Sequence, residues 1–407
     1  MEMMHSVDIA IVGGGMVGLA LAATFKDTEL RIAVIENRLP EEQISEQHDS
    51  RVSALNRATE NLLTHLGVWP DIMRSRSNSY TAMEVWEQDS FARIEFSAEN
   101  FAQPNLGYIV ENQVIQRALY EQVKRQSNVT FFAPTQCASM AIGESEAWLS
   151  LECGQALTAK LVVGADGANS WVRKQQDIPL THWDYGHNAI VANIKTLEAH
   201  NSHARQIFTP NGPLAFLPLD QPHLSSIVWS TSPEHAERLM SMSQAEFNKS
   251  ITAEFDNRLG LCEVVSERHA FPLKMRYARD FISERVALVG DAAHTIHPLA
   301  GQGVNLGFMD AACLHQQILS VWKQGKDIGA LRHLRKYERW RKAEATKMIA
   351  AMQGFKQLFD GKSPPKKLLR GVGIAITNQI PLLKEEIMKQ ALGLKGDLPE
   401  LACGNIN

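Results

Sequence analysis

Residues 7–18 read VDIAIVGGGMVG, an apolar run that ends in three consecutive glycines and a fourth three residues later. The apolar run predicts a strand that is buried on both faces of a parallel sheet. A helix is expected from about Met16 to Phe25, and a second strand, RIAVIE, spans residues 31–36. Strand, glycine turn, helix and strand together predict a βαβ unit of the kind that binds dinucleotides.

The glycines and one acidic residue each have a specific role in such a unit. Gly13 permits the tight turn, Gly15 lets the backbone approach a pyrophosphate, and Gly18 allows the helix to pack closely on the strand. Gly14 lies between the first two. Glu36 ends the second strand, 21 residues after Gly15, where a carboxylate accepts hydrogen bonds from ribose hydroxyls. A merely structural glycine turn is the alternative. The sequence has one such fingerprint and no C-x-x-C pair, which favours a single tightly held FAD over NAD.

The composition is that of a folded protein without a charge-based affinity for nucleic acid. The chain has 407 residues, of which 44% are hydrophobic and 21% charged, and its formal net charge is −4. The N-terminal segment is too short and polar for a secretory signal, and residues 371–383 are too short for a membrane span. Five separated cysteines without zinc-like spacing predict reduced thiols, no metal site and a cytoplasmic location.

Hydrophobic patterns change along the chain and predict a discontinuous α/β fold. Short alternating stretches predict antiparallel strands within residues 76–104 and 181–272, where we place a substrate domain. Apolar strands of the parallel type return near residues 161–164 and 285–290. The predicted FAD-binding domain comprises residues 1–75, 105–180 and 273–325, and residues 326–407 form a predicted helical C-terminal region.

Two further Gly–Asp sites follow these strands, GADGANS at residues 164–170 and GDAAH at residues 290–294. A dinucleotide fingerprint followed by these two sites resembles the FAD-dependent aromatic hydroxylases of the para-hydroxybenzoate hydroxylase type. The resemblance implies a Rossmann-type FAD-binding domain with an inserted antiparallel-sheet substrate domain. It also implies that Asp291 binds the ribityl chain of FAD and that Asp166 supports both the FAD and a transient nicotinamide site. A turn or helix N-cap is the alternative for each aspartate.

Residues 294–310, HTIHPLAGQGVNLGFMD, are similar to the signature of the ubiquinone-biosynthesis branch of that family. Gly301 and Gly303 would let the backbone approach the isoalloxazine edge of FAD. A helix is expected to begin near Val304 and to include Asn305, and its N-terminus would stabilise negative charge on the reduced ring. The resemblance implies that Pro298 presents its carbonyl over the ring.

Four other residues belong to the predicted site or lie beside it. Arg51 matches a family arginine that reaches the FAD, with a surface arginine as the alternative. Asn112 falls where relatives bind the ribityl chain, and a simple helix N-cap explains it equally well. His294 and His297 have no third metal ligand beside them, so we interpret them as structural hydrogen-bonding residues rather than acid–base or metal residues.

Taken whole, the chain resembles the 2-polyprenylphenol hydroxylases, most firmly up to about residue 341. The resemblance implies a monooxygenase that uses FAD, NAD(P)H (NADPH before NADH) and O2. Its implied substrate is a 2-polyprenylphenol, hydroxylated ortho to its hydroxyl in ubiquinone biosynthesis through a flavin C4a-hydroperoxide. The sequence assigns no catalytic base. The alternatives are another ring position, a small soluble phenol, an FAD-dependent isoprenoid reductase and a non-catalytic flavoprotein.

Basic residues are concentrated in the C-terminal region. Residues 331–347 contain seven Lys or Arg and two Glu, and four more Lys or Arg between residues 362 and 370 precede the apolar residues 371–383. A solvated helix face is the commoner explanation of such a run, and a docking helix with a charged edge has the same pattern. The pattern also suits peripheral contact with the inner face of a membrane or with other ubiquinone-biosynthesis proteins.

Overall fold

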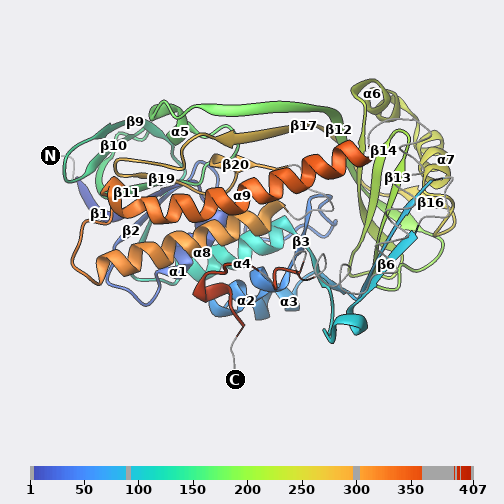
Figure 1. Ribbon diagram of the computed structural model, residues 1–407, viewed down its shortest axis with the longest axis horizontal. Coiled ribbons are helices and arrows are strands. Elements are labelled where there is room, and N and C mark those ends of the chain that lie inside the picture. The colour runs from blue at the N-terminus through green and yellow to red at the C-terminus, as the bar shows by residue number, and fades with distance from the viewer. Residues whose placement is uncertain are drawn as a thin grey trace.

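The computed structural model describes residues 4–88, 93–296, 303–359, 389, 392–394 and 396–404. Figure 1 shows two units side by side, one built on a largely parallel sheet and the other on an antiparallel sheet. Within the described ranges, no helix combines the length and the apolarity that crossing a membrane requires.

The first sheet has eight strands, and the predicted strand of residues 7–12 lies near its centre. The order is β18-β19-β11-β1-β2-β8, and every pair from β19 to β8 is parallel. Because β1 pairs with strands on both sides and is covered on both faces, its sequence is almost continuously apolar. The strands are β1 His5–Val12, β2 Ile32–Ile35, β8 Val129–Phe132, β9 Cys137–Ile142, β10 Ala147–Leu151, β11 Ala156–Gly164, β18 Ile282–Ser283 and β19 Val286–Leu288.

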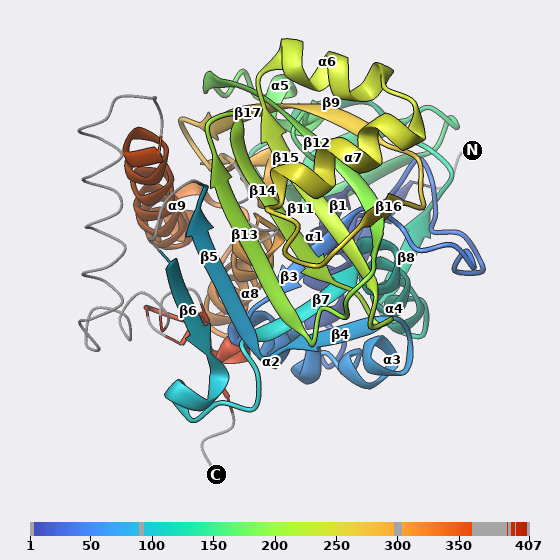
Figure 2. The ribbon, with the colours of Figure 1, turned by 90° about the vertical axis from the view of Figure 1, so that its right-hand side faces the viewer.

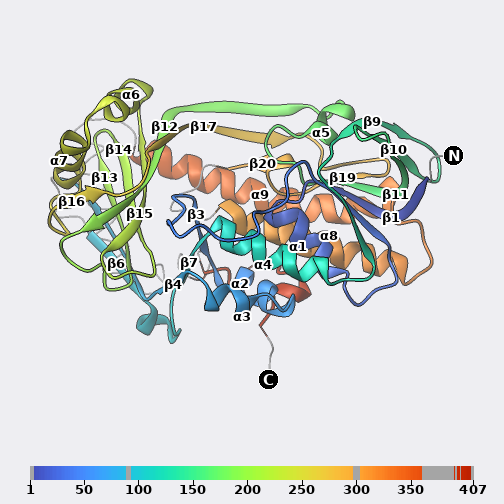
Figure 3. The same cartoon turned by 180° about the vertical axis from the view of Figure 1, so that it is seen from behind.

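Helices cover this sheet and enclose the largest hydrophobic core. Figure 3 shows α1, α4 and α8 on the same side of the sheet, and α1 packs against both of the others. Helix α9 packs on α8 and runs lengthwise along the outside of the molecule (Figure 1). The helices of this unit are α1 Met16–Thr24, α2 Arg57–His65, α3 Trp69–Arg74, α4 Asn112–Lys124, α5 Trp171–Gln175, α8 Gly303–Trp322 and α9 Leu331–Phe359.

The second large sheet has nine strands in the order β20-β17-β12-β15-β14-β13-β5-β6, with β16 beside β12. All its pairs are antiparallel except β13 with β5. Figure 2 shows helices α6 Pro233–Ser241 and α7 Gln244–Glu254 over its outer face. The strands are β5 Ala82–Glu87, β6 Arg93–Ser97, β12 Leu180–Thr196, β13 His203–Thr209, β14 Gly212–Pro218, β15 Leu224–Thr231, β16 Cys262–Val264, β17 His269–Ala278 and β20 His294–Thr295.

A small third sheet, β3-β7-β4, lies between the two units. Its strands are β3 Val52–Leu55, β4 Ser77–Tyr80 and β7 Gly107–Glu111. An apolar cluster joins it to the nine-stranded sheet through residues such as Ala54, Ile109 and Leu217. Three short 3₁₀ helices complete the described elements: η1 Ala98–Phe101, η2 Gly290–Ala292 and η3 Glu400–Ala402.

The structure refines the predicted division of the chain. Strand β4 pairs with β7 in the small sheet instead of joining the nine-stranded sheet. Strands β12 and β17 are long because they reach from one unit to the other (Figure 1), and β17 runs across residue 272, where we placed a boundary. The residue limits of the domains therefore stay a prediction. The apolar residues 371–383 lie outside the described ranges.

Candidate cofactor site

The glycine turn after β1 is shaped by close contacts that exclude side chains at two positions. Gly13 has φ +112°, and a Cβ there would lie 2.4 Å from the carbonyl oxygen of Ala165. A Cβ on Gly18 would lie 2.0 Å from the carbonyl oxygen of Gly13. Gly15 differs, because a Cβ there would meet no atom within 4 Å. The first two positions hold turn, helix and strand together, and the third opens onto free space.

Helix α1 presents an open N-terminus at this turn. It begins at Met16, and Gly15 at the N-cap supplies no side-chain acceptor. The first N–H groups of a helix have no acceptor inside the helix, and the helix dipole makes this end partly positive. Free space, bare N–H groups and positive charge are what a pyrophosphate requires.

Glu36 lies directly after β2 and folds back onto the turn. Its Oε2 accepts a hydrogen bond from the Gly14 N–H at 2.5 Å, and its Oε1 accepts one from the Arg38 N–H at 2.9 Å. With the glycine turn it lines a cavity of about 450 Å³ at the carboxyl ends of β1, β2 and β11. The cavity is lined by Val12, Gly13, Gly15, Ile35, Glu36, Asn37, Thr135, Gln136, Cys137, Ala165, Asp166, Gly167, Asn169 and Trp171.

Asp166 lines the same cavity from the end of β11. Its Oδ2 accepts hydrogen bonds from the N–H groups of Trp171 at 2.6 Å and Val172 at 3.1 Å, so it binds the N-terminus of α5. The interpretation of Asp166 as a helix cap therefore accounts for its Oδ2 oxygen. The other, Oδ1, is buried and has no hydrogen-bond partner in the structure. A buried carboxylate oxygen needs a donor, and a hydroxyl of a bound nucleotide would supply one.

Two substitutions of Asp166 separate its structural contact from its contact with a ligand. We expect Asp166→Ala to lower the free energy of unfolding by about 0.5–2 kcal/mol, because the first turn of α5 loses its acceptor. Asp166→Asn keeps one acceptor oxygen and should retain most of that stability. Both variants should bind FAD about tenfold or more weakly, because each lacks the unpartnered carboxylate oxygen that we propose accepts a hydrogen bond from the cofactor. Urea unfolding and flavin fluorescence titration measure the two effects; wild-type FAD affinity in Asp166→Asn would contradict the assignment.

Asp291 lies in η2, directly after β19, at the same edge of the sheet. The turn is joined to the neighbouring strand by the Val289 N–H, which donates to the carbonyl of Gly164 at 3.0 Å. Asp291 is exposed in part to solvent, but the surrounding protein desolvates its carboxylate, which raises its pKa. The positive charges of His294 and Arg276 act in the opposite direction but do not outweigh the desolvation.

Three elements meet closely beside this turn. A Cβ on Gly307 of α8 would lie 2.8 Å from a methyl of Val17 in α1 and 3.2 Å from the Cα of Gly290. The absence of a side chain at residue 307 therefore lets the N-terminal parts of α1 and α8 approach η2. This contact connects the cavity at the glycine turn to the start of α8.

A buried ionic network fixes the position of η2. Asp310 of α8 is fully buried, and its Oδ2 accepts hydrogen bonds from the Gly290 N–H at 2.9 Å and from His294 Nε2 at 2.6 Å. Its Oδ1 accepts a hydrogen bond from Arg341 Nε of α9 at 2.6 Å. Burial acts to raise the pKa of Asp310, but the attraction of His294 and Arg341 outweighs it and leaves the pKa below its ordinary value. His294 thus has the structural role that we predicted, whereas the role of Asp310 was missed.

The role of Arg173 of α5 was also not predicted from the sequence. It is buried, and its two terminal nitrogens donate to the carbonyls of Ala292 at 2.7 Å and Ala168 at 2.9 Å. The side chain therefore ties the middle Asp-Gly site to the late Gly-Asp site. Nothing in the sequence distinguishes it from an exposed arginine on a short helix, because its partners are backbone carbonyls that only the fold brings to it.

The remaining predicted residues gather around β3. Asn112 is the first residue of α4, after Glu111 at the N-cap, so the interpretation of Asn112 as a cap is wrong. Its Oδ1 accepts a hydrogen bond from the Ser53 hydroxyl at 2.7 Å, and its N–H donates to the carbonyl of Arg51 at 3.0 Å. Arg51 is exposed.

Asn305 connects this group to α8. Its side-chain nitrogen donates to the carbonyl of Ala54 at 2.8 Å, and its oxygen accepts from the Thr59 hydroxyl at 2.7 Å. These contacts hold the first turn of α8, which begins at Gly303, against β3. Pro298, Gly301 and His297 lie outside the described residues.

The structure therefore arranges the predicted residues in two connected groups. Gly13, Gly14, Gly15, Gly18, Glu36 and Asp166 surround or support the cavity. The start of α8 and η2 connect them to Asn112 and Arg51. The open space at Gly15, the bare helix end and the unpartnered oxygen of Asp166 all fit an elongated dinucleotide such as FAD. In the part of the chain that the structure describes, no three His, Cys, Asp or Glu side chains form a group suited to a metal ion.

Comparison with known proteins gives matches over nearly the whole chain. The family described as FAD binding domain matches residues 6–352. The chain is 37% identical over 388 residues to the 3-demethoxyubiquinol 3-hydroxylase of Escherichia coli strain K12, covering 95% of this chain and 98% of that one. It is 36% identical over 430 residues to the mitochondrial ubiquinone biosynthesis monooxygenase of Xenopus tropicalis, covering 94% and 92%.

A solved structure supports the architecture. The p-nitrophenol 4-monooxygenase of Pseudomonas putida DLL-E4 superposes with a TM-score of 0.78, at 20% identity, over 96% of this chain and 99% of that one. At this identity the likeness concerns the fold. It confirms the predicted α/β class with a Rossmann-type domain and an inserted antiparallel sheet.

Proposed function

Because the chain belongs to the FAD binding domain family and is an FAD-dependent aromatic monooxygenase, we propose that it hydroxylates a polyprenylated phenol in ubiquinone biosynthesis. The observation that carries the proposal is similarity over more than nine tenths of each chain to two enzymes, one named for ubiquinone biosynthesis and the other for a demethoxyubiquinol substrate. The first candidate substrate is a 2-polyprenylphenol, hydroxylated ortho to its hydroxyl. The name of the Escherichia coli relative favours a demethoxyubiquinol ring position as the second candidate.

The chemistry of the reaction belongs to the cofactor, and the protein binds and orients the reactants. When bound, FAD would carry two electrons from NAD(P)H to O2, so that one oxygen atom enters the ring and the other leaves as water. NADPH is the expected electron donor. We propose that the glycine turn and the N-terminus of α1 hold the pyrophosphate. Glu36, Asp166 and Asp291 would accept hydrogen bonds from hydroxyls of FAD. The network around Asp310 keeps the Asp291 turn in place.

An apolar surface beside β3 suits a prenylated substrate. Half-buried apolar side chains border the cluster between the small sheet and the nine-stranded sheet. One of them, Val52, directly precedes Ser53, whose hydroxyl donates to Asn112 in the predicted cofactor site. This surface would exclude water from the reacting ring and accommodate an isoprenoid chain. Its half-buried members are Val52, Met83, Val85, Phe101 and Val228.

The test is the quinone-lipid profile, under air, of cells that lack the protein. We expect an under-oxygenated precursor to accumulate, with 2-polyprenylphenol the first candidate, and the intact gene to restore the normal profile. The Asp291→Ala variant should fail to restore it, because we propose that the carboxylate binds FAD. Incorporation of ¹⁸O from ¹⁸O2 into the product would separate hydroxylation from reduction of an isoprenoid double bond. An unchanged quinone pool, with no related hydroxylase present, would contradict the pathway assignment.

A further inference from the structure

One face of α9 carries basic side chains that the proposed reaction does not use. Arg332, Arg335, Lys336 and Arg339 are all exposed. Their spacing of three, four and seven residues places them on one side of a helix, over about 10 Å of its length. We call these four residues the α9 basic face. The opposite side of the helix is buried through residues such as Leu334 and Tyr337, and the Tyr337 hydroxyl donates to the carbonyl of Leu288.

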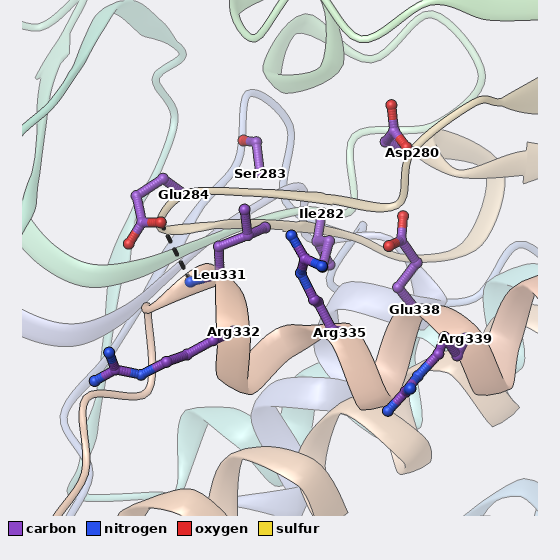
Figure 4. A pocket seen from close by; sticks show the side chains of 9 residues that line it. All are labelled: Asp280, Ile282, Ser283, Glu284, Leu331, Arg332, Arg335, Glu338 and Arg339. Atoms are coloured by element: carbon purple, nitrogen blue, oxygen red, sulfur yellow. Dashed lines mark hydrogen bonds between the residues drawn. The ribbon is translucent and has the colours of Figure 1, made fainter.

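The acidic side chains near the α9 basic face have other partners. Glu338 accepts from the Phe281 N–H at 2.9 Å and pairs with Lys342 Nζ at 2.9 Å. Glu284 accepts from the N–H of Leu331 at 3.3 Å (Figure 4). Within the described ranges no carboxylate lies within ion-pair distance of any of the four basic residues. Among the described residues, these four charges therefore have no acidic partner.

The α9 basic face borders an open cavity of about 630 Å³ between α9 and the hairpin of β18 and β19. Figure 4 shows Arg335 extending from α9 toward Ile282, whereas Arg332 and Arg339 extend away from it, and all three line the cavity. Glu284 precedes β19, whereas Asp291 follows it, so this cavity lies at the end of the strand opposite to the cofactor site. It is therefore a different surface from the one where FAD and the phenol would meet.

We propose that the α9 basic face docks the protein on an anionic lipid bilayer. Clustered Lys and Arg side chains are attracted to the phosphates of anionic lipids, and α9 lies on the outside of the molecule (Figure 1). The sequence after α9 adds four basic residues and then the apolar residues 371–383, a composition that suits the membrane interface. This inference rests on the proposed function in one respect, because a polyprenylated phenol is itself a membrane lipid. These observations favour a bilayer over an acidic protein partner.

The experiment is co-sedimentation of the FAD-loaded full chain with vesicles at low salt. One set contains phosphatidylcholine alone, and the other contains about one third phosphatidylglycerol. We expect binding to the anionic vesicles only, and added salt should release the protein. Replacing the four residues together, Arg332→Gln, Arg335→Gln, Lys336→Gln and Arg339→Gln, should lower the partition coefficient on the order of a thousandfold.

A matched control removes the same charge elsewhere. Lys26, Lys124, Arg125 and Lys249 are exposed on or beside α1, α4 and α7, and their joint replacement by Gln should change the partition coefficient by less than about threefold. Equal binding to both kinds of vesicle, equal loss in both variants, or no vesicle binding by the wild type would overturn the proposal. Turnover of a short-chain polyprenylphenol in detergent should be unchanged in the α9 variant. If the wild type lacks that turnover, the proposed function fails and the vesicle result still decides the docking surface.

Discussion

Asp310→Asn is expected to lower the free energy of unfolding by about 3–5 kcal/mol, because it removes the anion from a fully buried ionic network. Arg341 would keep its charge in the interior with no carboxylate to neutralise it. The amide also makes weaker contacts with the Gly290 N–H and His294. Urea unfolding of FAD-free protein measures the loss. Because η2 would be loosened, weaker FAD binding should accompany it.

A surface ion pair involving the same helix provides the control. Asp280 pairs with Lys342 at 3.3 Å, and 59% of the Asp280 side chain is exposed. Asp280→Asn should therefore cost no more than about 1 kcal/mol. Equal losses of unfolding free energy in the two variants would mean that the buried network stabilises the fold no more than a surface ion pair does.

The same network predicts a pH dependence. The pKa of Asp310 lies below its ordinary value of 3.8 in the folded protein. A carboxylate with a lowered pKa stabilises the fold fully above its unfolded pKa, and the stabilisation is lost as pH falls through the folded value. The stability difference between wild type and Asp310→Asn should therefore be constant near neutral pH and shrink below about pH 4. A difference that grows on acidification would contradict this.

Gly15→Ala is expected to weaken FAD binding by about ten- to a hundredfold and to leave the fold intact. A methyl group at this position meets no protein atom within 4 Å, and the backbone of Gly15 is extended, with φ −74°. Alanine therefore fits the protein, and its lower unfolded-state entropy should even stabilise the FAD-free form slightly. The added methyl would instead occupy the space that we assign to the pyrophosphate, at a cost of about 1–3 kcal/mol. Equilibrium dialysis of FAD and thermal unfolding of the FAD-free protein measure the two effects.

Alanine substitutions at two other glycines serve as controls for Gly15→Ala. A methyl group on Gly354 of α9 would also meet no atom within 4 Å, and Gly354→Ala should stabilise the helix by up to about 1 kcal/mol without changing FAD affinity. Gly18→Ala should disrupt the turn itself, because its methyl would collide with the Gly13 carbonyl. Wild-type FAD affinity in Gly15→Ala would show that the phosphates bind elsewhere.

The sequence by itself determined the βαβ unit and the order of the cofactor motifs, and its resemblance to the aromatic hydroxylases implied the enzyme class. These features are local: an apolar strand, the glycines that follow it, and an acid at the end of the next strand are read from short segments. The family match confirms the predicted FAD and the aromatic monooxygenase class. Gly13, Glu36 and Asp166 meet in one cavity because parallel neighbouring strands end at the same edge of a sheet.

Only the tertiary structure decided which charged residues are buried and which face outward. Arg341 and Arg339 are two residues apart on one helix, yet the first is buried against Asp310 and the second is exposed on the α9 basic face. Arg173 likewise reaches a carbonyl more than a hundred residues away as well as a nearby one. Such roles depend on which side of a helix packs against the rest of the protein. That choice is set by contacts between segments distant in sequence, which no local pattern records.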